Sequence, residues 1–171
     1  MAPNPVIVTA YDPQWPDCFS AIAAEIRDAL GDLALAIHHV GSTSVPGLAA
    51  KPIIDLDVVI ADYSGFPVVV EKLAFIGYLH EGDLGIPCRE AFCYEDKAQL
   101  SKHHLYVCPA DSPELKRHLT FRDYLRSHPE AIAEYSRIKQ EAAALHPTDI
   151  DGYIRHKSPF IEKIYMQCGL A

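Results

Sequence analysis

Apolar residues along the first half of the chain occur either at helical spacing or in short continuous runs. Helical spacing, closed in one case by Gly31, predicts two amphipathic helices. Runs rich in Val and Ile predict strands, because β-branched side chains favour extended backbone. By these criteria we expect helices over 17–30 and 66–77 and strands over 33–40 and 53–60, with residues 6–8 forming a strand or an extended arm.

The second half of the chain begins with broken strands and ends in helices. Residues 78–94 contain Gly82, Gly85 and Pro87, which interrupt the extended pattern, and 104–108 form a further strand-like run. Three helices follow, one from Ser112-Pro113, one over 129–145 and one from 148 or 149 to about 169. Strands first and helices last predict an α+β fold, in which a mixed sheet is flanked by helices and the C-terminal third is helical.

Composition narrows the class of protein. The chain has 171 residues, which suits a single domain over 1–171, and an apolar content of 49% argues against disorder. Lys and Arg number 15 against 23 Asp and Glu, so 15 − 23 = −8, a charge that disfavours a protein coating extended nucleic acid. We see no membrane span, no signal peptide and no zinc spacing among the five cysteines, so we expect a cytoplasmic protein with reduced thiols.

The most informative polar residues are two aspartates inside the strand predicted over 53–60. Asp55 and Asp57 are two positions apart, so both side chains point to one face of the sheet while Leu56 points to the other. Adjacent carboxylates repel each other, and a divalent cation between them removes that repulsion. Oxygen ligands favour Mg²⁺ or Mn²⁺ over Zn²⁺. The alternative is structural, with one aspartate exposed and the other capping a loop.

A turn of glycine and hydroxyl residues precedes this strand. Gly41 allows the backbone to approach a ligand closely, and Ser42, Thr43 and Ser44 supply hydroxyl and N–H groups. Such a turn is suited to binding an anion. The alternative is an ordinary turn that is capped by its own Ser and Thr side chains.

Together the turn and the two aspartates resemble the signature of the nucleotidyltransferase superfamily, which has the polymerase-β-like fold. The longer segment His39–Asp57 is similar to the hallmark of the GrpB family, which also occurs fused to dephospho-CoA kinase. Other blocks of that family are similar to Tyr11–Pro16, His104–Val107 and Phe121–Arg126, so the resemblance covers most of the chain. It implies a nucleotidyltransferase-like fold more firmly than it implies a reaction.

The resemblance also implies roles for individual residues. Gly41, Ser42 and Thr43 would hold the phosphates of a nucleotide. Asp55 and Asp57 would act as metal ligands and catalytic carboxylates for attack on the α-phosphate. The cation would neutralise charge on the phosphorus being transferred and orient the reacting groups.

One position departs from the superfamily pattern. Active members usually carry a third carboxylate on a later strand, and the strand predicted over 104–108 has none. His104 occupies that place, where an imidazole can bind Mn²⁺ or act as a general base. The alternative for His104 is a histidine that is simply hydrogen-bonded beside the sheet.

Basic residues form the next layer of candidates. Lys51 lies inside the hallmark segment and Arg89 lies just before Phe92, and these two are our candidates for contacts with phosphate. Four more lie on the late helices, where each taken singly is more typical of a solvated charge or an intrahelical pair: Arg122, Arg126, Lys139 and Lys157.

Three functions fit these residues. The first is metal-dependent transfer of a nucleotidyl group from an NTP to a small-molecule or protein acceptor, with Mg²⁺ or Mn²⁺ as cofactor. The second is a non-catalytic module that binds a nucleotide or a CoA-like molecule, which the missing third carboxylate favours. The third is a metal-dependent phosphohydrolase built from Asp55, Asp57 and His104. All three predict a small phosphorylated ligand and leave the acceptor, the base preference and the oligomeric state open.

Overall fold

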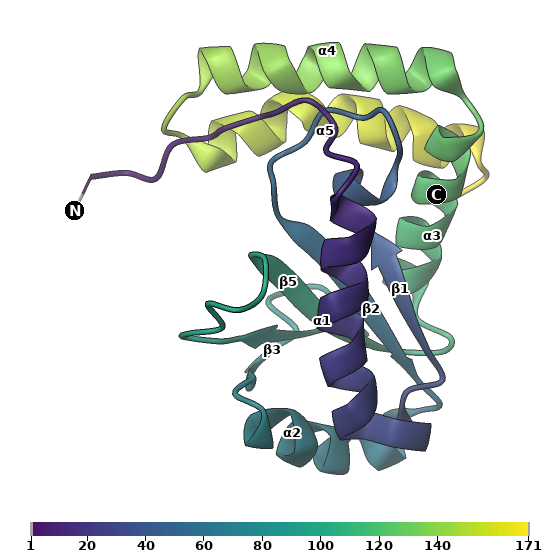
Figure 1. Ribbon diagram of the computed structural model, residues 1–171. Coiled ribbons are helices and arrows are strands. Elements are labelled where there is room, and N and C mark those ends of the chain that lie inside the picture. Colours follow the sequence, from purple (N-terminus) through teal and green to yellow (C-terminus); the bar gives the residue numbers. More distant parts are fainter. Residues whose placement is uncertain (1, 171) are drawn as a thin grey trace.

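Figure 1 shows the computed structural model of the chain, which describes residues 2–170. Within these residues the helices are α1 (Trp15–Leu30), α2 (Phe66–Phe75), α3 (Pro113–Arg126), α4 (Pro129–Leu145) and α5 (Ile150–Gln167). The strands are β1 (Ala36–Val40), β2 (Ile54–Ile60), β3 (Leu79–Gly82), β4 (Glu90–Cys93) and β5 (His103–Pro109). Short 3₁₀ turns occupy Gly31–Leu33, Ser42–Ser44 and Tyr63–Gly65.

The strands form one mixed sheet in the order β1-β2-β5-β4-β3. Strands β2 and β5 run parallel to each other, and the other neighbouring pairs are antiparallel. In this register Asp55 lies beside His104 of β5, and Asp57 lies between Tyr106 of β5 and His38 of β1. The sheet therefore places both aspartates on an inner strand, next to polar side chains of its neighbours.

The two faces of the sheet are covered differently. Helices α1 and α2 pack on one face (Figure 1), where Ile22 and Leu56 belong to the same buried cluster. Helix α3 covers part of the opposite face through Leu115, which packs with Val59. Because side chains alternate along β2, the two aspartates point to the α3 side and away from the main core.

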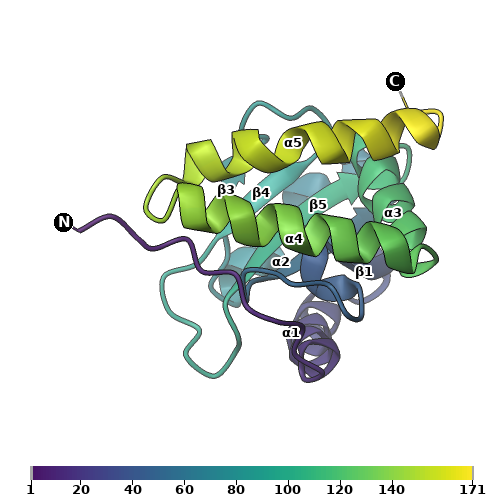
Figure 2. The same cartoon turned by 90° about the horizontal axis from the view of Figure 1, so that it is seen from above.

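Helices α4 and α5 lie side by side across one end of the sheet, as Figures 1 and 2 show. They pack on α3 and on the segment between β1 and β2 through a cluster that includes Val45, Leu48, Tyr135 and Phe160. The rings of Tyr135 and Phe160 are stacked with their centroids 4.7 Å apart. The helices therefore stand over the end at which β2 and β5 begin.

The N-terminal segment is an arm that is held at two points. The N–H of Val6 donates a hydrogen bond of 2.8 Å to the carbonyl of Pro147, between α4 and α5. Thr9 pairs with Ala50 in an isolated antiparallel bridge. The run at 6–8, which the sequence left open between a strand and an arm, is therefore an arm.

The predicted fold class, an α+β arrangement with a mixed sheet and a helical C-terminal third, is confirmed. Two late helices begin where capping predicts, because Ser112 and Asp149 each accept a hydrogen bond from a backbone N–H of the first turn. The first strand begins at Ala36 rather than at 33, because a 3₁₀ turn occupies Gly31–Leu33. None of the helices within residues 2–170 is long and apolar enough to cross a membrane.

Candidate functional site

A cleft of about 810 Å³ lies between the start of β2 and β5 and the paired helices α4 and α5. Residues from the turn after β1, from the segment before β4 and from α3 complete its walls. Of the residues predicted from the sequence, the cleft brings together Ser42, Lys51, Asp55, Arg89 and His104. It adds four charged residues of the late helices, which are Glu114, Lys139, Lys157 and Glu162.

Asp55 lies between the Gly41-Ser42 turn and His104. Its Oδ1 atom is 3.0 Å from Nδ1 of His104. Because an ionised carboxylate only accepts hydrogen bonds, Nδ1 of His104 is the donor, and in the neutral form of the ring Nε2 is an acceptor. A Cβ atom at Gly41 would lie 2.2 Å from Oδ2 of Asp55, and the φ angle of Gly41 is +72°. Both the backbone conformation and the neighbouring carboxylate therefore require glycine at this position.

Asp57 is fully buried, and helix α3 supplies its partner. Nδ1 of His118 donates to Oδ2 of Asp57 at 2.6 Å, and Nε2 of the same ring lies 3.1 Å from Oε1 of Glu114. Burial lowers the pKa of His118, but hydrogen bonds to Asp57 and Glu114 outweigh it and raise this pKa to about 9. The imidazole is therefore a cation at neutral pH. Oδ1 of Asp57 has no hydrogen-bond partner among residues 2–170.

Three lysines line the same cleft as Asp55 without a carboxylate partner. Lys51 precedes β2, Lys139 lies on α4 and Lys157 lies on α5, and we call these three residues the lysine wall. The ring of Tyr153 has the ammonium of Lys51 at 5.5 Å and that of Lys157 at 5.1 Å from its centroid. In the described part of the chain, none of the three comes within 4.0 Å of a carboxylate oxygen.

Burial dominates the electrostatics of the lysine wall. Lys139 is 2% exposed, and burial followed by the charge of Lys157 lowers its pKa well below the usual range. Burial and the charge of Lys51 lower the pKa of Lys157 to about 8. Asp55 opposes both shifts without reversing them. Because a buried ammonium group without a partner costs free energy, the wall is suited to an anion that supplies the missing charge.

Arg89 lines the cleft from the segment before β4. Its guanidinium carbon lies 4.2 Å from the centroid of the Tyr106 ring, so the two groups are stacked. The Nε atom of Arg89 is buried and has no hydrogen-bond partner among the described residues. Stacking on an aromatic face orients the guanidinium and leaves its N–H groups available to a ligand.

Two arginines of α3 hold the turn that follows β1. Arg126 donates two hydrogen bonds to the carbonyl of Ser44, at 3.0 and 2.8 Å. Arg122 donates one to the carbonyl of His39 at 3.1 Å and pairs with Asp123 at 2.9 Å. These arginines therefore fix the two ends of the Gly41-Ser42 turn, and the pairing of Arg122 with Asp123 agrees with the alternative drawn from the sequence.

Three of the predicted residues lie outside the set that lines the cleft. Thr43 is 1% exposed, and its hydroxyl lies 2.9 Å from Nε2 of His39. Asp57 is turned to His118, and Gly41 contributes by leaving room for Asp55. Each of the three supports a neighbour of the cleft, and their roles toward a ligand remain predictions.

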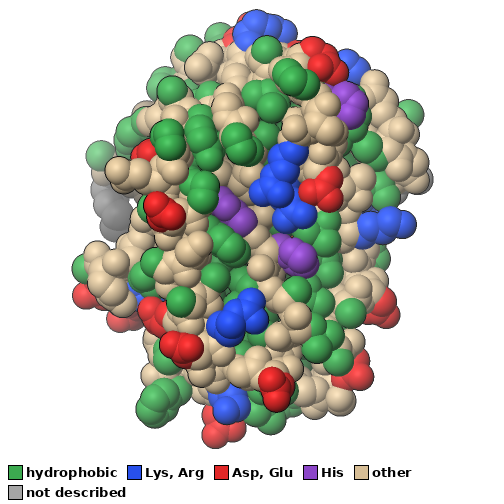
Figure 3. Space-filling model, turned by 45° about the vertical axis from the view of Figure 1, so that its right-hand side comes forward, with side chains coloured by type: hydrophobic (Ala, Val, Ile, Leu, Met, Phe, Trp, Pro, Cys, Tyr) green, Lys and Arg blue, Asp and Glu red, His purple; other side chains and the backbone are tan. Residues whose placement is uncertain are grey.

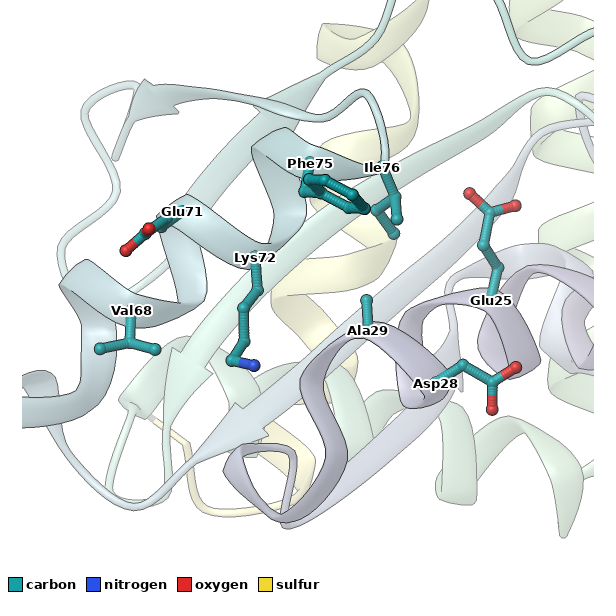
Figure 4. Close-up of a pocket in the computed structure, with 8 residues that line it drawn as sticks. All are labelled: Glu25, Asp28, Ala29, Val68, Glu71, Lys72, Phe75 and Ile76. Carbon is teal, nitrogen blue, oxygen red and sulfur yellow. The ribbon is translucent and has the colours of Figure 1, made fainter.

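Another hollow, of about 650 Å³, lies between α1 and α2 (Figure 4). It contains the apolar side chain of Phe75, which is 92% exposed. The charged residues around it have both signs, and are Glu25, Asp28, Glu71 and Lys72. No residue that the sequence predicted for the site lies in this hollow, so the cleft beside Asp55 is the candidate site.

A Mg²⁺ or Mn²⁺ ion at this site would share its coordination between the aspartates of β2 and a phosphate. Among residues 2–170, no three His, Cys, Asp or Glu side chains lie close enough together to hold a metal ion by themselves. Mg²⁺ is commonly held by one or two carboxylates together with water and substrate phosphates. Oδ2 of Asp55, which faces Gly41, and the unpartnered Oδ1 of Asp57 are the oxygen atoms available for such an ion.

The fold that carries this cleft defines the class of protein. The chain is similar to the Cid1 poly(U) polymerase in its structure with Mg 3′-dATP bound, with a TM-score of 0.56. The two are 13% identical, and the match covers 79% of this chain and 43% of Cid1. At that identity the likeness concerns the fold alone, and the fold of this chain is nucleotidyltransferase-like.

Within this class the chain belongs to the GrpB family, as its sequence motifs predicted. The family model described as GrpB protein matches residues 5–167. The crystal structure of the conserved protein GrpB from Enterococcus faecalis matches with a TM-score of 0.83 and 35% identity, over 94% of this chain and 96% of that one. UPF0157 protein YqkA of Bacillus subtilis is 36% identical over 157 residues, and the chain spans 92% of its own length but 45% of YqkA.

Sequence reasoning missed two residues that α3 contributes and underrated a third on α4. Glu114 and His118 are four residues apart, so their spacing shows that they share a helix face. The spacing does not show that this face meets Asp57. Lys139 was expected as a surface charge, but it is buried, because α4 turns it toward the cleft.

Proposed function

We propose that this chain is a metal-dependent nucleotidyltransferase that moves a nucleotidyl group from an NTP to a small-molecule or protein hydroxyl. The observation that carries the proposal is the lysine wall, which lines one cleft together with Asp55. A triphosphate would supply the negatively charged partner that the three lysine side chains lack within the protein. The cleft volume of about 810 Å³ falls within the range of roughly 300–1,000 Å³ for sites that hold small molecules.

The proposed reaction divides its tasks among the residues of the cleft. The acceptor oxygen forms a bond to the α-phosphorus, the bond from that phosphorus to the oxygen bridging the β-phosphate breaks, and pyrophosphate leaves. Lys51, Lys139 and Lys157 would balance the charge of the departing pyrophosphate. His104 would take the proton of the acceptor hydroxyl at Nε2, while its Nδ1 donates to Asp55.

The carboxylates and the turn would act on the phosphates. Asp55 and Asp57 would hold the Mg²⁺ or Mn²⁺ ion, which when bound neutralises charge on phosphate oxygens and orients the reacting groups. Gly41 and Ser42 would offer N–H and hydroxyl groups to the same phosphates. The two oxygens of Asp55 support this division, because Oδ1 meets His104 and Oδ2 faces Gly41.

Calorimetry with a non-hydrolysable NTP analogue, with and without Mg²⁺, tests the binding half of the proposal. We expect the wild-type chain to bind the analogue more tightly with Mg²⁺, and Asp55→Asn to remove that gain. Asp28→Asn, at an exposed carboxylate of α1, is the matched control and should bind as the wild type does. If the affinity for the analogue changes neither with Mg²⁺ nor with Asp55→Asn, the proposal is contradicted.

The second candidate is a non-catalytic module that binds a nucleotide or a CoA-like molecule. Two observations favour it: β5 carries His104 but neither Asp nor Glu, and Asp57 is tied to His118. The products separate the candidates when NTP, Mn²⁺ and a broad panel of acceptors are mixed with the protein. Release of pyrophosphate supports transfer, metal-dependent binding without turnover supports the module, and release of inorganic phosphate supports the phosphohydrolase.

The ligand we propose is a single nucleotide rather than an extended nucleic acid. The chain has a net charge of −8, and Figure 3 shows acidic and basic side chains interspersed over the face it displays. A protein that binds a polymer needs a continuous basic surface along the phosphate backbone. The lysine wall instead gathers its charge within one cleft.

A further inference from the structure

A hollow of about 580 Å³ adjoins the cleft beneath the N-terminal arm, and we call it the arm pocket. It shares four residues with the cleft, including Lys51 and His104, so the two spaces meet there. Its own lining comes from residues 3–6, from Lys102 before β5, and from Thr148 and Ile150 at the start of α5. The arm pocket is therefore a separate space with direct access to the candidate site.

The wall that the arm contributes is fixed by contacts with the helices. Val6 is 8% exposed and packs with Tyr153, and its N–H donates to the carbonyl of Pro147 at 2.8 Å. Pro3 and Pro5 restrict the backbone of the same segment to a narrow range of φ. The pocket is thus formed before any ligand enters.

The arm pocket combines positive charge with exposed apolar surface. Burial lowers the pKa of Lys51; the charge of Asp55 opposes that shift and the smaller effect of Lys102 adds to it. Within residues 2–170 neither lysine lies within 4.0 Å of a carboxylate oxygen. Ile150 and Ile154 are 43% and 45% exposed at the same pocket. A surface of this kind suits a ligand that joins an anionic group to an apolar part.

We propose that the arm pocket binds the acceptor substrate, and that this acceptor is a hydroxyl-bearing organic anion with an apolar portion. The inference rests on the proposed function, because an acceptor has to reach both His104 and the α-phosphate. His104 lines both spaces, so a ligand in the arm pocket lies beside the residue proposed to receive its proton. Lys102 binds the anionic group, and Ile150 contacts the apolar portion.

Isoleucine methyl groups can report on the two spaces separately. Ile150 lines the arm pocket only, whereas Ile86 and Ile161 line the cleft only. Methyl NMR spectra of the full chain are recorded with phenyl phosphate, an anion that carries an apolar ring, and with Mg²⁺ and a non-hydrolysable ATP analogue. We expect phenyl phosphate to shift the Ile150 methyl even when the ATP analogue is bound, and the ATP analogue to shift Ile86 and Ile161.

Substitution of Lys102 tests the recognition of the anion. Lys102→Ala should weaken the binding of phenyl phosphate, followed at Ile150, by about tenfold, and should leave the affinity for the ATP analogue unchanged. Lys116→Ala, at an exposed lysine of α3, is the matched control and should change neither affinity.

The failures of the two proposals are distinguishable. Any one of three results would overturn the proposal that the arm pocket binds the acceptor. These are an unshifted Ile150 methyl signal with phenyl phosphate, displacement of phenyl phosphate by the ATP analogue, or equal affinity of Lys102→Ala and wild type for phenyl phosphate. If instead the ATP analogue fails to shift Ile86 and Ile161, the proposed function itself is overturned.

Discussion

The two sides of the cleft treat charge in opposite ways. On the side of the sheet, Asp55 has His104 at 3.0 Å and Asp57 has His118 at 2.6 Å. Of the lysine wall, Lys139 and Lys157 lie on the side of the helices and Lys51 lies just before β2, and none of the three meets a carboxylate oxygen within 4.0 Å in the described chain. A partner inside the protein offsets the desolvation cost of a buried charge, whereas a buried charge without a partner costs free energy until a ligand supplies one. The lysine wall is therefore the part of the site that most strongly indicates an anionic ligand.

The first test breaks the pairing on the side of the sheet, and it carries the largest expected effect. Asp57→Asn removes the fully buried counter-charge of His118 and leaves only Glu114, so we expect the free energy of unfolding to fall by about 3 kcal/mol. Asp55→Asn is the matched control, because the side chains of Asp55 and His104 are 29% and 48% exposed. Its expected loss is about 1 kcal/mol or less. Urea denaturation measures both, and equal losses would contradict the contrast between the two aspartates.

The second test removes a charge from the side of the helices. Lys139→Met keeps the length of the side chain and removes a buried ammonium, so the affinity for the NTP analogue should fall by about 100-fold, equivalent to about 2.7 kcal/mol. The same change should raise the free energy of unfolding by about 1 kcal/mol, because the desolvated charge is gone. Function and stability would thus move in opposite directions at one residue.

Lys163→Met is the control for that test, because Lys163 also lies on a late helix and its side chain is 56% exposed. We expect little change in either quantity there. Calorimetry and urea denaturation are run on the same preparations. If Lys139→Met lowers both stability and affinity, the lysine serves the fold, and the contrast between the two sides of the cleft is lost.

The fold could be predicted further than the site, for reasons that particular residues illustrate. The helix over Pro129–Leu145 carries its own start signal in Pro129, and β2 carries its own run of Ile and Val. These are local signals, and the structure agrees with them. The hallmark segment likewise carries Gly41 and Asp55, but the motif predicted only that Gly41 would let the backbone approach a ligand, and the close approach of Gly41 to Asp55 comes from the structure.

The remainder of the site depends on which helix faces meet, and that is set by tertiary packing. His118 reaches Asp57 because Leu115, on the same helix, packs against β2 through Val59. Lys139 is buried because α4 packs against α5 and the β1–β2 segment through clusters distant in sequence. From a single sequence, a charged residue at helical spacing is most simply interpreted as a solvent-exposed side chain. Neither His118 nor Lys139 could therefore be recognised as part of the site.

The smallest expected effect comes from pH, and here His118 and Lys157 should change the stability of the fold in opposite directions as pH rises. The pKa of His118 is about 9 in the folded chain against an ordinary 6.5, so its stabilisation is complete below pH 6.5 and is lost as pH rises through about 9. The pKa of Lys157 is lowered to about 8 from 10.5. As pH rises from about 8 to 10.5, the folded chain loses the buried ammonium charge, and the free energy of unfolding therefore increases. Between pH 6.5 and 8, the change in the free energy of unfolding therefore comes mainly from His118 and not from Lys157.

That window isolates the paired side of the cleft. Over it we expect the wild-type free energy of unfolding to fall by about 1 kcal/mol relative to His118→Gln, which lacks the titrating ring. Urea denaturation of both proteins at closely spaced pH values measures the difference. A difference that stays flat or grows with pH would mean that His118 is not held as a cation by Asp57 and Glu114. The sheet would then carry an unbalanced negative charge, and the acidic side of the cleft would need a ligand cation as much as the lysine wall needs an anion.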